Sequence, residues 1–215
     1  MKYPNALSGV KKIFLAELLA MIGTVLMVVA LILGVIAGLK EDLVGFGGAT
    51  IVAIVAGVLL VISYILNIVG VSKASKDDPA FKTALYAIVF GIVYTIITTT
   101  FSSAVEKSGL QEFSSLITDL INLVTMLFIV TGIRNLAEKQ GDRAMIAKGE
   151  RIMKIAYVME IIIFVTRAVS MFAFSNNDVI GTAVVIAAVV AAILNVVIYI
   201  LYLLYLGKAK KMLAE

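Results

Sequence analysis

The sequence predicts an all-α integral membrane protein whose six transmembrane helices are arranged as three antiparallel hairpins. Hydrophobic residues make up 62% of the 215 residues, and the mean hydropathy is +1.10. A soluble domain is nearer half apolar, because its surface must face water. Six apolar runs are long enough to cross a bilayer, and Lys and Arg gather in alternate loops. We therefore expect a single polytopic domain over residues 1–215, with the lipid bilayer as its main partner.

The six expected spans follow one another along the chain. A helix needs about 20 mostly apolar residues to cross a hydrocarbon core of about 30 Å. The first run is too long for the apolar region of a signal peptide, and no small-residue cleavage pattern follows it. The long runs do not alternate, which argues against a β-barrel. The expected spans are approximately residues 13–38, 43–71, 83–105, 113–133, 153–174 and 179–206.

The distribution of basic residues predicts the orientation. Of the 18 Lys and Arg residues, Lys40 and Lys107 fall on one side of the spans, Arg167 lies inside the fifth span, and all others fall on the opposite side. Short loops rich in Lys and Arg stay in the cytoplasm. We therefore expect a multi-pass protein of the cell membrane with both termini cytoplasmic. Because this orientation accounts for the pI of about 9.2, we expect no nucleic-acid partner.

The starts of the three expected hairpins resemble one another. Lys12, Lys82 and Lys154 each precede an apolar run, at intervals of about 70 residues. Three hairpins in one orientation would form a threefold internal repeat of parallel units. The alternative is that any protein with an even number of spans places a Lys at each cytoplasmic helix start.

Small residues at four-residue intervals predict close helix packing. The first span contains Gly34 and Gly38, and the second contains Ala49, Ala53 and Gly57. Such steps let membrane helices approach closely, either within one chain or between chains. A homo-oligomer or a membrane partner protein therefore stands as the alternative to contacts within the chain.

Several polar residues of the spans have simple structural interpretations. Glu17 lies near the start of the first span, so we expect its side chain to reach headgroup water or a Lys of the N-terminal tail. Tyr199, Tyr202 and Tyr205 lie near the cytoplasmic end of the sixth span, where tyrosines commonly anchor a helix at the interface. Asn67, in the second span, and Asn195, in the sixth, predict interhelical hydrogen bonds.

The remaining ionisable residues of the spans indicate a candidate site. Asp119 and Arg167 lie at similar depths below the outer membrane face, and Glu160 lies about two turns from Arg167. Charges in a membrane are costly unless they are paired or hydrated. They form either an interior salt bridge that fixes packing, or a site open to the outside in which Arg167 meets an anionic group. Asn122 shares the helical face of Asp119, and Thr98 and Ser102 belong to a matching polar stripe of the third span, so we expect the outer halves of these two neighbouring spans to line one polar cleft. The expected substrate-binding residues are Asp119, Arg167, Glu160, Asn122, Thr98 and Ser102.

Composition argues against an enzyme. The chain has no Cys and no His, and it contains no HExxH, GxSxG or P-loop motif. We expect no catalytic residues, metal or cofactor. The polar outer cleft favours a small transporter or a permease subunit. The alternative is a non-catalytic membrane scaffold, assembly factor or immunity protein, and a channel is a weaker third interpretation because no selectivity element is visible.

Overall fold

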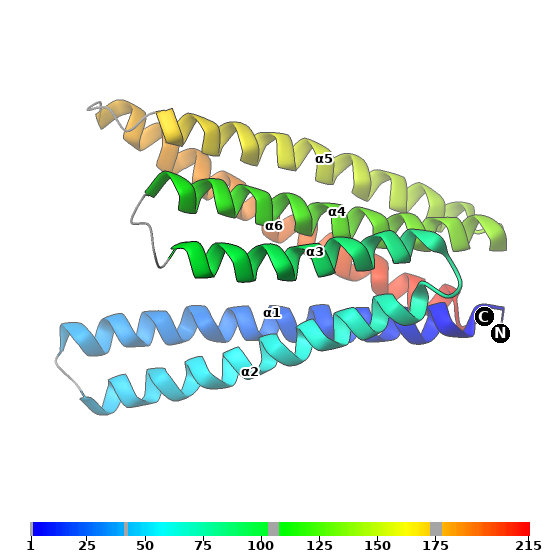
Figure 1. Ribbon diagram of the computed structural model, residues 1–215, viewed down its shortest axis with the longest axis horizontal. Helices are drawn as coiled ribbons and strands as arrows, with labels where there is room; N and C mark the ends of the chain where they lie inside the picture. The colour runs from blue at the N-terminus through cyan, green and yellow to red at the C-terminus, as the bar shows by residue number, and fades with distance from the viewer. Residues whose placement is uncertain (1, 41–42, 103–107, 173–177) are drawn as a thin grey trace.

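The computed structural model is built from six α-helices joined by short links (Figure 1). It describes the backbone of residues 2–40, 43–102, 108–172 and 178–215, and the side chains of residues 2–40, 44–100, 114–166, 189–190 and 193–215. This part of the chain contains no strand, which confirms the all-α prediction there. The helices are α1 (Pro4–Leu39), α2 (Leu43–Ala74), α3 (Pro79–Ser102), α4 (Ser108–Gln140), α5 (Arg143–Phe172) and α6 (Asp178–Met212).

Five of these helices contain segments long and apolar enough to cross a membrane. The fifth expected span, residues 153–174, falls on α5, whose outer end lies partly outside the described residues. Its crossing therefore stays a prediction. The five segments are Pro4–Leu39, Val44–Ala74, Pro79–Thr100, Ser114–Gln140 and Ile193–Met212.

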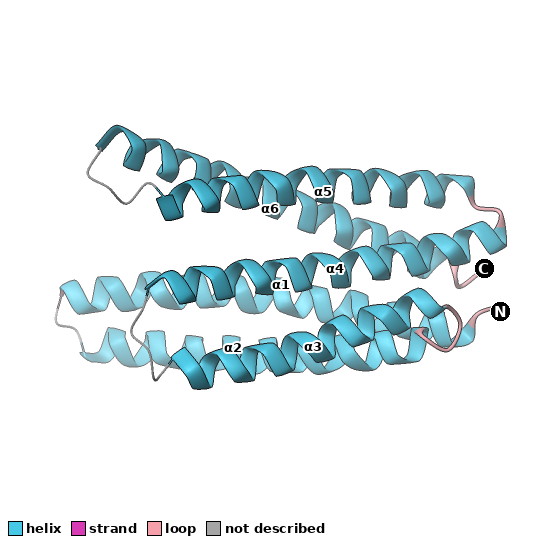
Figure 2. Cartoon of the chain, turned by 45° about the horizontal axis from the view of Figure 1, so that its top comes forward, coloured by secondary structure: helices cyan, strands magenta, loops and turns pink. Residues whose placement is uncertain are grey.

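The helices form an antiparallel bundle with both termini at one end, which we call the terminal end (Figures 1 and 2). Each helix packs against the next one in the sequence, and α6 also packs against α1. The six helices thus form a closed ring. Away from the terminal end, the α1–α2 pair and the α5–α6 pair diverge from each other in both views. The threefold internal repeat stays a prediction.

The terminal end holds the main hydrophobic core. All six helices contribute to it, and Ile13 of α1, Phe81 of α3 and Tyr205 of α6 are among its largest fully buried side chains. Leu136 and Met145, which flank the link between α4 and α5, are buried there as well. Burial on this scale makes the terminal end the tightly packed half of the bundle.

Towards the other end, large apolar side chains face outward. Leu31 of α1 and Ile51 of α2 are each 64% exposed, and Ile161 of α5 is 63% exposed. Contiguous exposed apolar surface of this kind is unfavourable in water but matches hydrocarbon. The distribution is that of a helical membrane protein, whose outside faces lipid.

Two glycines hold α1 and α2 in backbone contact. A Cβ atom at Gly70 would lie 2.8 Å from the carbonyl oxygen of Gly9 and 3.0 Å from the backbone nitrogen of Ile13. The predicted small-residue step of Gly34 and Gly38 does not bring the two backbones into such close contact. A Cβ at Gly34 would only touch Ala49, and one at Gly38 would meet nothing within 4 Å. The closest approach of the two helices is therefore at the terminal end.

We predict that Gly70→Ala destabilises the protein by about 1–3 kcal/mol, the usual cost of overpacking. The backbones of α1 and α2 would have to separate to admit the methyl group. Gly57→Ala in the same helix is the matched control, since its Cβ would meet nothing within 4 Å. The measurement is thermal or denaturant unfolding in detergent. Equal stability of the two variants would contradict the close contact.

Candidate functional site

Glu17 lies inside the bundle and joins three helices. Its carboxylate accepts a hydrogen bond from Asn67 Nδ2 of α2 at 3.1 Å. The hydroxyl of Tyr199, in α6, lies 2.9 Å from the other carboxylate oxygen and 2.6 Å from the Glu17 carbonyl oxygen. The expectation that Glu17 reaches the headgroups is therefore wrong, because its carboxylate is bound by hydrogen-bond donors inside the bundle. The interhelical hydrogen bond predicted for Asn67 is confirmed, and the one predicted for Asn195 stays a prediction.

The tyrosines of α6 are likewise interior rather than interfacial. Tyr202 is 3% exposed and Tyr205 is 2% exposed, and Tyr199 is bound to Glu17. The anchoring interpretation is therefore wrong for all three. At three-residue and six-residue spacings they share one face of α6, and that face turns towards the bundle.

A cavity of about 450 Å³ lies beside Glu17. Its wall is formed by five helices, α1, α2, α4, α5 and α6. Its polar lining consists of three carboxylates, three asparagine amides, two tyrosines and one threonine: Glu17, Asp119, Glu160, Asn67, Asn122, Asn195, Tyr199, Tyr202 and Thr125. The described residues that line it include no Lys or Arg. This volume is within the usual range for small-molecule sites.

Two polar atoms in this lining have no hydrogen-bond partner among the described residues. They are the hydroxyl of Tyr202 and Oδ1 of Asn67, and both atoms are buried. A buried polar atom without a partner is unfavourable by about 1–3 kcal/mol. Unsatisfied groups that border a cavity therefore favour a guest that can bind them, either water or a ligand.

The structure brings half of the predicted site residues to this cavity. Asp119, Asn122 and Glu160 line it, and Asp119 and Glu160 each have a hydrogen-bonding or electrostatic partner. Thr98 does not line it, and its hydroxyl instead lies within hydrogen-bond distance of the Tyr94 and Thr95 carbonyls of its own helix. Hydroxyls in helices commonly bond back in this way.

The side chains of Arg167 and Ser102 lie outside the described residues. The pairing of Arg167 with Asp119 therefore stays a prediction. Sequence reasoning gave Glu17 and Tyr199 structural roles and did not place them at the site. The available signal for Glu17 was its depth in the membrane. Glu17 lies five residues from Lys12 and Asn67 lies six residues from Lys73, so the two side chains are at similar depths near the same ends of their spans.

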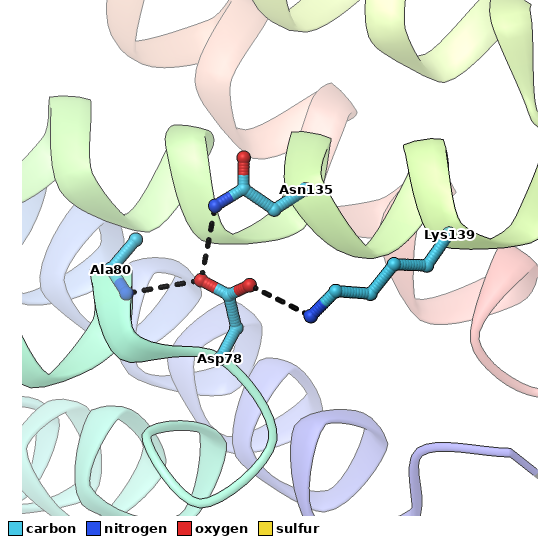
Figure 3. Close-up of polar contacts among 4 residues, drawn as sticks. All are labelled: Asp78, Ala80, Asn135 and Lys139. Atoms are coloured by element: carbon cyan, nitrogen blue, oxygen red, sulfur yellow. Dashed lines mark hydrogen bonds and ion pairs between the residues drawn. The ribbon is translucent and has the colours of Figure 1, made fainter.

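A second polar cluster ties the terminal end together around Asp78 (Figure 3). Asp78 is 3% exposed, and its carboxylate accepts hydrogen bonds from the backbone N–H of Ala80 at 3.0 Å and from Asn135 Nδ2 at 3.2 Å. Lys139 Nζ completes the cluster at 3.3 Å. Asp78 thus caps α3 and fastens it to α4. An Asp followed by Pro at the first helical position is a typical helix start, and it places the beginning of α3 four residues before the expected span.

The neighbouring Asp77 fastens the α2–α3 link to the start of α1. Its carboxylate accepts hydrogen bonds from the Ala6 backbone N–H at 2.7 Å and from Asn5 Nδ2 at 3.0 Å. It thereby satisfies a backbone donor that the first turn of a helix leaves free. The two aspartates close the terminal end over the core and leave the cavity deeper in the bundle.

Among the described residues, no group of three or more Asp and Glu side chains is close enough to hold a metal ion. Comparison with known proteins gives no match to any family model, curated protein or solved structure. The cavity itself is therefore the basis for any functional argument.

We predict that removing two hydroxyls of α6 changes the stability of the protein differently. Tyr199→Phe deletes a hydrogen bond to the half-buried Glu17 carboxylate and should lower stability by about 1.5–3 kcal/mol. Tyr202→Phe deletes a hydroxyl that has no partner among the described residues, and it should leave stability unchanged or raise it. The measurement is unfolding of each variant in detergent. A loss on Tyr202→Phe as large as that on Tyr199→Phe would show that the Tyr202 hydroxyl is bonded in the protein.

Proposed function

We propose that the protein is a small multi-pass membrane carrier, or the membrane subunit of one, that binds a solute inside its ring of helices. The observation that carries the proposal is the 450 Å³ cavity with Glu17, Asp119 and Glu160 in its lining. Ionisable groups in membrane segments are costly, and they commonly mark substrate and ion pathways. A scaffold needs neither the cavity nor several carboxylates around it.

The packing of the bundle supports a cavity that opens away from the termini. The apolar core and the Asp77 and Asp78 contacts close the terminal end. With the termini in the cytoplasm, as the basic residues indicate, the carrier faces outward in this conformation. Parallel hairpin repeats, if present, would match the construction of many carriers.

We predict that reporter fusions after Asp42 and after Asp78 report opposite sides of the membrane. The basis is the concentration of Lys and Arg on the Asp78 side of the spans. The fusion after Asp78 should be cytoplasmic, and that after Asp42 external. Same-side results would overturn the orientation and, with it, the outward-facing cavity.

We predict that water-soluble reagents reach the cavity. The chain has no cysteine, so single-cysteine variants can be read without background. Asn122→Cys, in the cavity wall, should react with an impermeant methanethiosulfonate added outside. Ala84→Cys, in the fully buried core of α3, should not react. Lys40→Cys, exposed at the end opposite the termini, is the positive control.

The same experiment separates the carrier from its main alternative. A scaffold or assembly factor predicts a dry interior, because nothing has to pass through it. If Asn122→Cys reacted no faster than Ala84→Cys while Lys40→Cys reacted fully, the interior would be closed to water. That result would favour the scaffold.

A further inference from the structure

A second cavity of about 720 Å³ lies among α1, α2, α3 and α4. It shares Glu17, Asn67, Asn122 and Thr125 with the first cavity, so the two meet at the Glu17 carboxylate. Polar groups thus form the boundary between two spaces that together exceed the size of one small-molecule site.

The second cavity extends to the lipid-facing surface between α2 and α3. Its lining includes Tyr64, Ile65 and Ile96, which are 46%, 55% and 61% exposed. These side chains lie where hydrocarbon surrounds the helices. A molecule dissolved in the bilayer can therefore approach Glu17 from the side, without crossing the packed terminal end.

The charge of this interior selects the sign of the ligand. Glu17 receives its described hydrogen bonds from an amide and a phenol, both neutral groups. A carboxylate in a low-dielectric site is strongly stabilised by a positive partner and strongly opposes a negative one. Asn67 Oδ1, which has no hydrogen-bond partner among the described residues, adds a free acceptor beside it. The Tyr202 hydroxyl, on a side chain 3% exposed, has no partner among these residues either and can donate or accept.

The remaining walls select an apolar body. Met126, Ile129, Met159 and Ile198 line the first cavity, and Leu60, Ile88 and Ile92 line the second. The rings of Tyr64 and Tyr199 border these spaces, and aromatic faces attract cations. An inorganic ion would leave this apolar surface uncovered, whereas an organic cation would bury it.

We propose that the ligand is an amphiphilic organic cation, which enters from the bilayer between α2 and α3 and pairs with Glu17. This inference rests on the proposed carrier function and adds the chemical class of its substrate and its route. The charged group lies at the junction of the two cavities, and the apolar part occupies the space that leads to lipid.

The test uses the purified full-length protein in detergent and two probes of matched shape and opposite charge. Tetraphenylphosphonium is the cation and tetraphenylborate is the anion, and equilibrium dialysis measures their binding. We expect saturable binding of the cation and none of the anion. Glu17→Gln should weaken cation binding by about tenfold or more, because a buried charge pair is lost.

Glu138→Gln is the matched control, since Glu138 is an exposed residue of α4 that lines neither cavity. It should bind the cation with wild-type affinity. A second measurement does not depend on how Glu17→Gln folds. Tetraphenylphosphonium should slow the reaction of N-ethylmaleimide with Asn122→Cys in an otherwise unchanged chain, and tetraphenylborate should not.

The inference is overturned if tetraphenylphosphonium does not bind, if the anion binds equally well, or if neither the Glu17→Gln substitution nor the Asn122→Cys protection has an effect. If Asn122→Cys is accessible to water-soluble reagent while no cation binds, the carrier stands and the cationic class fails. If Asn122→Cys is inaccessible and no cation binds, both proposals fail.

Discussion

Glu17 of α1 is surrounded by membrane helices, and hydrogen-bond donors on two of these helices bind its carboxylate. Asn67 of α2 and Tyr199 of α6 both bind it, so one side chain of α1 joins the first, second and last helices. No water from the bilayer core replaces these donors. The contact closes the ring between α6 and α1 and fixes the depth at which the three helices meet. The cavities on either side of it exist because these helices are held there.

The terminal end of the bundle is tightly packed, and the cavities lie deeper in the bundle. At the terminal end, apolar packing and the close approach of Gly9 and Gly70 leave little free space. Asp77 and Asp78 satisfy the backbone N–H groups at two helix starts, which allows those starts to pack without loss of hydrogen bonds. Deeper in the bundle, polar side chains replace part of the apolar packing and the cavities appear. A rigid end beside a less tightly packed polar interior is a suitable arrangement for a protein that admits a guest.

The two cavities differ in their surroundings, although both include Glu17. The first is lined by residues of five helices, Asp119 and Glu160 among them, while the second reaches side chains exposed to lipid. A ligand that spans both has its charge in the polar region and its apolar body next to hydrocarbon. Such a division matches an amphiphile better than a hydrated ion, because neither part of an amphiphile is then in an unfavourable environment.

The sequence by itself determined the helical class, and five of its expected spans fall on helices apolar enough to cross a membrane. Length and hydropathy carry that information locally, residue by residue. It also identified Asp119, Asn122 and Glu160 as candidate site residues, because polar and ionisable side chains within a span commonly face the interior of the bundle rather than lipid. The tertiary structure decided that Glu17 and the tyrosines of α6 face inward rather than towards the headgroups. Tyr199 lies 182 residues from Glu17, and only the closure of the ring brings its hydroxyl to that carboxylate. Depth along a helix can be counted in a sequence, but the direction in which a side chain points depends on which helices become neighbours.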